Sequence, residues 1–189
     1  EYGYKVINYF DDDARDGNAH QASLGLRGHW TERLSYQAWG GFQGREYDNN
    51  AYADFYGFVA RGALRYVLSE VSDIVIKGDR SPQESTFGGQ NFYTRNRAEL
   101  VWTHQIAERW SFRAREVIQL NRYSAETAQG SELKTREDVA WESSVGLEYK
   151  MPNDLISIFG DYKYRARESN LDFLSYDDQV ISAGVRANF

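Results

Sequence analysis

The sequence predicts an all-β chain whose strands run up and down in sequence order and pair antiparallel. Apolar and polar residues alternate with period two along most of the 189 residues, which is the signature of strands with one apolar face. The connections between the alternating segments are short and long in turn, as in a series of hairpins. Aromatic residues gather beside the short connections. These observations predict a single meandering sheet.

The composition agrees with strands and excludes several other classes of protein. The chain contains 5 Trp, 14 Tyr and 10 Phe but only 2 Pro and no Cys. Aromatic side chains favour strands, and without Cys neither a disulfide framework nor a thiolate metal site can form. No apolar run reaches the roughly 18 residues that a transmembrane helix needs. A mean hydropathy of -0.69 is still compatible with a membrane, because a barrel strand shows lipid only every second residue.

Ten strands are expected, and the length fits one domain over residues 1–189. No signal peptide precedes the first strand pattern, so we expect a mature or trimmed chain. In order, the predicted strands cover residues 2–10, 19–30, 34–47, 52–68, 73–81, 91–106, 110–124, 136–152, 155–168 and 177–189.

The alternation defines two faces along these strands. Even positions carry the apolar side in 23–30, 98–106 and 156–166, and odd positions carry it in 139–151 and 181–189. Residues 94–110 also have a helix-like composition, but the period of two favours a strand there.

The connections are short and long in alternation, and the two kinds fall at opposite ends of the sheet. Short connections are expected at 31–34, 69–72, 107–109 and 152–154, and long ones at 11–19, 47–54, 81–91, 123–134 and 168–176. Outer-membrane barrels have short periplasmic turns, longer extracellular loops and an even number of strands. We therefore expect an antiparallel up-and-down transmembrane β-barrel of about ten strands in the bacterial outer membrane.

Residues beside the short connections support the membrane interpretation. They are mostly aromatic, as in the girdle that marks a boundary between water and lipid: Trp30, Leu34, Tyr66, Trp110, Tyr149 and Met151. The alternative is a soluble β-barrel or sandwich that acts as a binding module. Such a protein would bury the apolar face and expose the charged one.

The last strand resembles the β-signal of bacterial outer-membrane proteins. That pattern places a polar residue, a glycine, an apolar residue and a terminal aromatic at fixed spacing, and Ser182, Gly184, Ala187 and Phe189 fill it. The resemblance implies that the barrel-assembly machinery reads this strand during insertion. It also implies that Phe189 anchors the strand in lipid.

Most of the chain is similar to porin-2-like outer-membrane β-barrel proteins found beside exopolysaccharide biosynthesis and export systems. The likeness is carried by residues 78–100, 136–151 and 161–185, above all by the tyrosine-rich strand that ends in Arg-Ala-Arg-Glu-Ser-Asn. Members of that family are usually longer. The resemblance therefore leaves two alternatives open, a complete narrow barrel and the C-terminal part of a wider one.

The face opposite the apolar one is strongly basic. With the apolar side toward lipid, the other side carries fifteen cations: Lys5, Arg27, Arg45, Arg61, Arg65, Lys77, Arg95, Arg97, Arg113, Arg115, Lys150, Lys163, Arg165, Arg167 and Arg186. Its acids are Asp79, Glu99, Glu142, Glu148 and Asp161, while acids in the long connections, among them Asp177 and Asp178, bring the chain to a net charge of -6. Charged groups in lipid cost a few kcal/mol each, so the cations are expected to face inward.

A basic interior predicts a porin-like conduit for anionic solutes, because a pore lined with Arg and Lys favours anions. The predicted lining is Arg27, Arg45, Arg61, Arg65, Arg95, Arg97, Arg113, Arg115, Lys163, Arg165, Arg167 and Arg186, with Glu99, Glu142, Glu148 and Asp161 as salt-bridge partners. The family resemblance adds an association with exopolysaccharide secretion.

A second function fits the same charges. Arg–Glu networks can fill a barrel, which would then be a structural or adhesive protein with a plugged interior and acidic binding loops. A two-residue turn at Asn153 and Asp154, for example, places Glu142 opposite Arg165 across the hairpin.

Catalysis and nucleic-acid binding find little support. His20, His29 and His104 form neither a metal-ligand spacing nor a catalytic triad, so no enzyme activity, metal or cofactor is expected. With acidic loops outside and cations inside, the chain is not expected to bind nucleic acid. The expected partners are outer-membrane lipid and lipopolysaccharide, the barrel-assembly machinery, anionic polysaccharide and secretion-system proteins.

Overall fold

A computed structural model describes residues 2–7, 16–49, 53–85, 91–129, 132–152 and 155–187. Its ten strands form one antiparallel sheet in the order of the sequence. They are β1 (Tyr2–Ile7), β2 (Gly17–His29), β3 (Leu34–Tyr47), β4 (Phe55–Ser69), β5 (Ser72–Glu84), β6 (Phe92–Ala107), β7 (Trp110–Gln129), β8 (Glu132–Lys150), β9 (Ile156–Ser169) and β10 (Tyr176–Ala187), with a 3-10 turn η2 (Asp172–Leu174) before the last. The predicted all-β, up-and-down architecture is confirmed.

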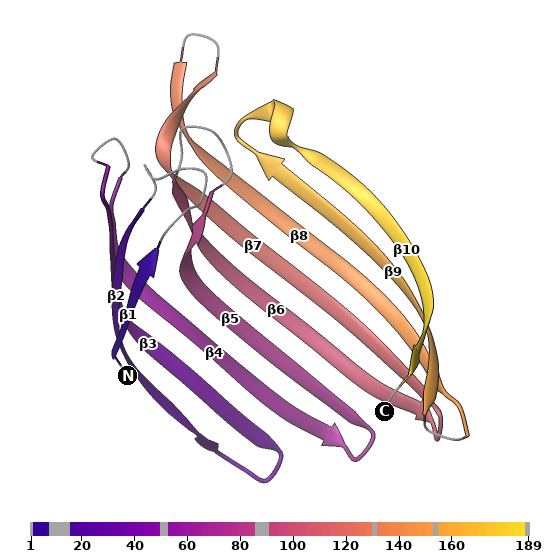
Figure 1. Ribbon diagram of the computed structural model, residues 1–189. Helices are drawn as coiled ribbons and strands as arrows, with labels where there is room; N and C mark the ends of the chain where they lie inside the picture. The colour runs from indigo at the N-terminus through magenta and orange to yellow at the C-terminus, as the bar shows by residue number, and fades with distance from the viewer. Residues whose placement is uncertain are drawn as a thin grey trace.

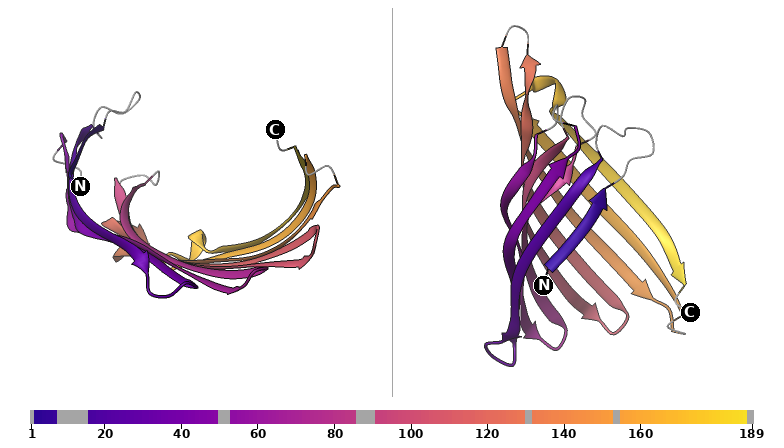
Figure 2. Two further views of the ribbon diagram at one scale, coloured as in Figure 1. Left: turned by 90° about the horizontal axis from the view of Figure 1, so that it is seen from below. Right: turned by 60° about the vertical axis from the view of Figure 1, so that its left-hand side comes forward.

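The sheet is bent into a deep trough, with the short turns at one end and the longer connections at the other (Figure 1). Seen along the trough, β1 and β10 lie on its two rims, well apart from each other (Figure 2). Among the described residues β1 pairs with β2 and β10 pairs with β9, and the two rims are not paired with each other. The described strands therefore form an open barrel wall, and a closed ten-stranded barrel is not what the structure contains.

The predicted register of the last long hairpin is confirmed. Glu142 lies opposite Arg165, and Ser144 lies opposite Lys163, in the β8–β9 pairing. The turn residues Asn153 and Asp154 lie outside the described residues.

Three strands are longer than the sequence predicted. β5 continues through Pro82 to Glu84, and β7 and β8 continue to Gln129 and from Glu132, so most of the predicted loop at 123–134 is strand. The β7–β8 pairing shifts register between Arg122 and Glu126 and then continues as a hairpin that rises above the sheet (Figure 1). Apolar and polar residues do not alternate there, so the period-two rule could not detect these strand ends.

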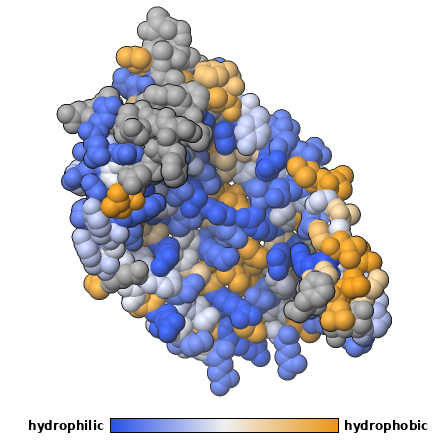
Figure 3. Space-filling model, viewed as in Figure 1, coloured by the Kyte–Doolittle hydropathy of each residue, from blue (hydrophilic) through white to orange (hydrophobic). Residues whose placement is uncertain are grey.

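The two faces of the sheet have opposite chemistry. Large apolar side chains on the convex face are exposed, for example Leu24 (83%), Phe42 (70%) and Ile181 (83%). Figure 3, which looks into the trough, shows hydrophilic residues across most of the concave face. A soluble module would have the reverse arrangement, so the structure contradicts that alternative. A contiguous apolar face of this size requires hydrocarbon or a partner to cover it.

Paired polar side chains interrupt the convex face. Arg80 donates to the side chain of Asn96 over 2.7 Å, the Ser143 hydroxyl donates to Glu116 over 2.6 Å, and Arg122 lies 3.2 Å from its partner Glu137. Each charged group thus has a local partner, which lowers the cost of its position.

Burial is concentrated at the end with the long connections. Tyr47, Phe55, Val59 and Phe92 form a small buried cluster on β3, β4 and β6. At the other end Trp30 packs on Tyr36 with centroids 4.7 Å apart, and Trp110 packs on Tyr149 at 4.9 Å, as expected for the girdle. None of the described residues forms a helix with the length and hydropathy of a membrane-spanning helix.

Candidate functional site on the concave face

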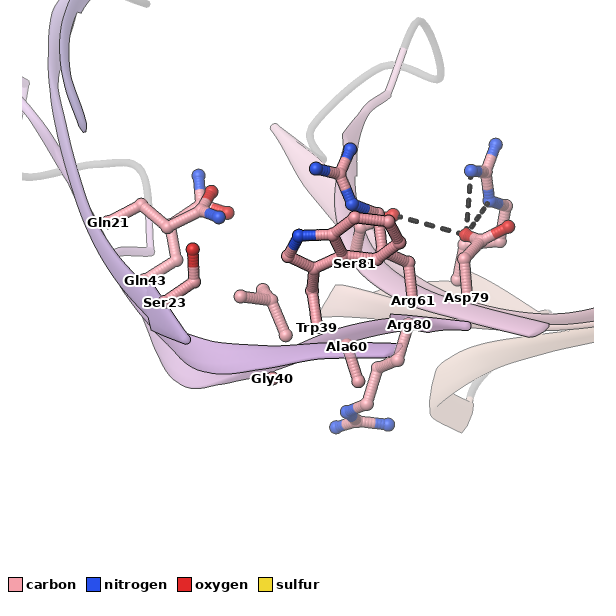
Figure 4. Close-up of a pocket in the computed structure, with 12 residues that line it drawn as sticks. Gln21, Ser23, Trp39, Gly40, Gln43, Ala60, Arg61, Asp79, Arg80 and Ser81 are labelled. Carbon is pink, nitrogen blue, oxygen red and sulfur yellow. Dashed lines mark hydrogen bonds and ion pairs between the residues drawn. The ribbon is translucent and has the colours of Figure 1, made fainter. Parts of the chain in front are cut away.

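The pairing register places all the predicted basic lining residues on one face of the sheet. Paired residues share a face, and the partners run without interruption from Arg27 on β2 to Arg186 on β10. Figure 4 shows the side directly: Arg61 and its partner Asp79 point into the trough, whereas Arg80, the next residue of β5, points away from it. Their role as an anion pathway remains a prediction.

Four charged residues of this face were missing from the sequence-based set. Asp73, Asp138 and Asp178 share it by register, and Arg136 joins them through its hydrogen bonds to Asp138. Asp178 was counted with the acids of the long connections, although the predicted strand 177–189 includes it; it lies in β10 and pairs with Arg165. These residues lie near strand ends. A predicted strand boundary is uncertain by one or two residues there, and a side chain just outside the predicted strand is not assigned to either face.

A ladder of ion pairs crosses the middle of the trough from β5 to β9. Glu99 lies 3.6 Å from Lys77, 2.7 Å from Arg97 and 3.1 Å from Arg115. Arg115 also pairs with Glu142, which lies 3.8 Å from Lys163. Four cations thus share two carboxylates. The ladder holds the guanidinium groups in place. Because the cations outnumber the carboxylates, the middle of the trough keeps a positive charge.

A second cluster is buried at the end with the long connections. Arg136 donates two hydrogen bonds to Asp138, of 2.6 and 3.0 Å, and stacks on the Tyr123 ring at 4.2 Å. Arg167 lies 4.0 Å from the same carboxylate. Tyr123 lies beyond the roughly ten residues of β7 that would span a bilayer. Burial raises the pKa of its phenol to about 12, so the hydroxyl remains a donor toward Asp138.

Of the remaining predicted salt-bridge residues, Glu148 pairs with an arginine of the predicted set, whereas Arg165 and Asp161 differ from the prediction. Arg186 pairs with Glu148 at 3.2 Å, as the set allowed. Arg165 pairs with Asp178 at 2.6 Å instead of Glu142, because Asp178 faces it directly across β9 and β10. Asp161 forms no ion pair with another described residue; its carboxylate lies over Gly146, where a Cβ would collide with it.

Other ion pairs take up further cations of the set. They join Arg65 to Asp73 at 3.1 Å, Arg95 to Asp79 at 2.8 Å, and Arg45 to Glu84. Three arginines of the set, Arg27, Arg61 and Arg113, form no ion pair with any described residue. They are spread over β2, β4 and β7, so unneutralised charge extends across the trough.

Two hollows lie side by side on the β2–β5 part of the concave face. One, of about 460 Å³, is lined by Gln21, Gln43, Trp39, Arg61 and Asp79, among others (Figure 4). The other, of about 540 Å³, is lined by residues that include Arg27, Arg65 and Lys77. Both combine cations with uncharged polar groups, a lining that suits hydrated anions.

The predicted assembly segment lies on the rim strand β10, with Phe189 outside the described residues. Ser182 and Gly184 face the trough, and Ala187 faces outward. A Cβ at Gly184 would collide with the Phe159 ring, and Arg186 lies over the same ring at 5.1 Å. The packing of the Phe159 ring against Gly184 therefore requires glycine at this position, independently of the assembly pattern.

Two of the three histidines, His20 and His29, are exposed on β2, and the third, His104, is partly buried on β6. His20 accepts or donates a hydrogen bond with the Tyr2 hydroxyl at 2.6 Å, and His104 stacks on Trp102 with centroids 5.9 Å apart. Within the described ranges, no three His, Cys, Asp or Glu side chains gather closely enough to hold a metal ion.

An up-and-down antiparallel sheet with an apolar convex face and a charged concave face defines the wall of a porin-like β-barrel. The family described as "Putative beta-barrel porin 2" matches residues 4–189, and the chain belongs to that family. The resemblance seen in the sequence is thereby confirmed. No curated protein matches the chain.

Proposed function

We propose that the protein is an outer-membrane conduit whose concave face guides anionic solutes. The observation that supports this most strongly is the excess of cations on that face after its ion pairs are counted. Four cations share two carboxylates in the central ladder, and Arg27, Arg61 and Arg113 have no carboxylate partner among the described residues.

The physical basis is a positive potential held in a low-dielectric wall. Cations lining a narrow aqueous path raise the local anion concentration and repel cations. The ladder contributes by fixing Arg97 and Arg115 through Glu99, so that their charges stay at the wall. Guanidinium groups also recognise carboxylate and phosphate with directed hydrogen bonds.

The cellular setting belongs to the same proposal. The apolar convex face and the aromatic residues beside the short turns suit an outer-membrane bilayer with lipopolysaccharide outside. The β10 pattern suits insertion by the barrel-assembly machinery. The likeness to proteins found beside exopolysaccharide export systems suggests that an anionic polysaccharide and secretion-system proteins are its partners.

Reversal potentials in planar bilayers under a salt gradient test the conduit. The intact protein should conduct with anion selectivity, and the double substitution Arg27→Gln with Arg61→Gln should reduce that selectivity. The control is Arg80→Gln with Arg122→Gln, which removes the same charge from the convex face and should leave selectivity unchanged. Cation selectivity, or equal effects of the two double variants, would overturn the proposal.

A plugged structural barrel is the second candidate, favoured by the ladder that links β5 to β9. In that case the same bilayers would remain silent, and binding would fall to the acidic connections. Several of these connections, including 8–15 and 86–90, lie outside the described residues.

A further inference from the structure

Trp39 stands on the concave face at the centre of the 460 Å³ hollow, among polar neighbours (Figure 4). The alternation of β3 places this large aromatic side chain on the same face as Gln37 and Gln43 rather than on the lipid side. An indole on the polar face of the sheet is not explained by membrane anchoring. Its surroundings indicate a recognition role.

Trp39 is fixed from the side of β2. A Cβ at Gly25, its direct partner on that strand, would overlap the five-membered ring of the indole, so the ring packs against the bare glycine backbone. Glycine is therefore needed at position 25 for the indole to pack against the backbone of β2. This contact holds the indole in one orientation before a ligand binds.

Arg61 is held from the other side. It is the partner of Trp39 on β4, and its Cζ lies 4.6 Å from the centroid of the indole. A cation–π contact of this kind orients a guanidinium without neutralising it. Arg61 has no carboxylate partner among the described residues, whereas Arg95 in the same hollow is paired with Asp79 by two hydrogen bonds. Arg61 is thus an ordered cation that is available to a ligand.

The other walls of the hollow supply neutral hydrogen-bonding groups. The amides of Gln21 and Gln43 face it from β2 and β3, and Ser81 lies beside Asp79 on the β5 side. Each amide offers both a donor and an acceptor, which suits hydroxyl groups. An ordered guanidinium, two amides and an indole together match a ligand with one carboxylate, several hydroxyls and an apolar C–H surface.

We propose that this hollow binds a sugar acid, a monosaccharide unit that carries a carboxylate. The carboxylate lies on Arg61, the hydroxyls lie on Gln21 and Gln43, and the C–H face of the ring lies against the exposed part of Trp39. The proposal rests on the anion conduit proposed above and names the class of solute that its wall selects.

Calorimetric titration of the intact protein in detergent tests the site with sodium glucuronate, glucose and sodium acetate as probes. Glucuronate should bind saturably and more tightly than glucose or acetate. Arg61→Gln and Trp39→Leu should each weaken glucuronate binding by about tenfold, the effect of losing one charged hydrogen bond or one stacking surface. Trp39→Phe keeps an aromatic ring and should retain part of the affinity.

Arg113→Gln is the matched control, since Arg113 is another arginine of the same face without an ion pair but lies outside the hollow. It should change the affinity by less than about twofold. Equal binding of acetate, equal binding of glucose, no saturable binding, or an equal loss in the control would each overturn the proposal. A reversal potential separates the two ideas: if anion selectivity persists without saturable glucuronate binding, the conduit stands and the sugar-acid site falls.

Discussion

At the scale of single residues, the ion pairs of the concave face differ mainly in burial. The Asp138 side chain is fully buried (0%) and that of Arg136 nearly so (4%), whereas the side chains of Arg165 and Asp178 are each about 40% exposed. Removing Asp138 takes a buried carboxylate away from two guanidinium groups, those of Arg136 and Arg167. Removing one member of an exposed pair leaves a charge that water can solvate.

Asp138→Asn should therefore destabilise the protein far more than Asp178→Asn. We expect a loss of about 3–5 kcal/mol for the buried pair and about 0–1 kcal/mol for the exposed one. Urea unfolding in lipid vesicles, followed by tryptophan fluorescence, measures both. Equal losses would show that the buried cluster does not stabilise this end of the sheet.

Glu99 is the acid on which the central ladder depends. Glu99→Gln leaves Lys77, Arg97 and Arg115 close together with one carboxylate removed, so both the positive potential and the mutual repulsion rise. We expect stronger anion selectivity together with a lower midpoint of thermal unfolding. Glu148→Gln, which frees only Arg186, should change both quantities less. Bilayer recordings and heat-dependent gel mobility are the measurements, and a fall in selectivity for Glu99→Gln would contradict this assignment.

At the scale of one strand, neighbouring residues of β7 lie on opposite faces of the sheet. Ile118 is 50% exposed on the convex face, and Gln119 faces the trough beside Arg97. Ile118→Arg should cost about 2–4 kcal/mol if its side chain lies near the bilayer midplane. Gln119→Arg introduces the same group on the other side and should be tolerated. The fraction of each variant that folds into vesicles checks this, and equal yields would mean that the convex face is not in lipid.

Strands of this kind are easy to recognise from sequence in their middle and difficult at their ends. The alternation in 139–151 and 156–166 gave the faces and the β8–β9 register correctly, because one face is apolar and a shift by one residue would turn it to the other side. The same rule failed beyond Tyr123, where β7 and β8 leave that constraint. Ion-pair partners such as Arg165 and Asp178 depend on pairing between strands and could be assigned only once the register was known.

Trp39 is the clearest residue that pattern reading missed. Alternation places it among polar residues, but the contacts that give it meaning come from Gly25 on one neighbouring strand and Arg61 on the other. No spacing within β3 could have revealed either contact. An aromatic residue on the polar side of an alternating strand is the signal that could have drawn attention to it.

At the scale of the whole molecule, the short turns and the long connections should lie on opposite sides of the outer membrane. Asp172, in η2 between β9 and β10, belongs to the long-connection end, and Glu32 lies in the short turn between β2 and β3. A membrane-impermeant maleimide added to intact cells should label Asp172→Cys. It should label Glu32→Cys only after the outer membrane is permeabilised. The reverse pattern would invert the orientation.

The unpaired rims of the trough have a consequence for how the wall is completed. Along β1 and β10, every second amide and carbonyl points sideways, away from the neighbour the strand already has. Hydrocarbon supplies neither donors nor acceptors, so such a border is not stable while it faces acyl chains. Each rim must therefore pair with another strand before the protein is stable in a bilayer. The circumference of the closed barrel depends on which strands pair with these two rims.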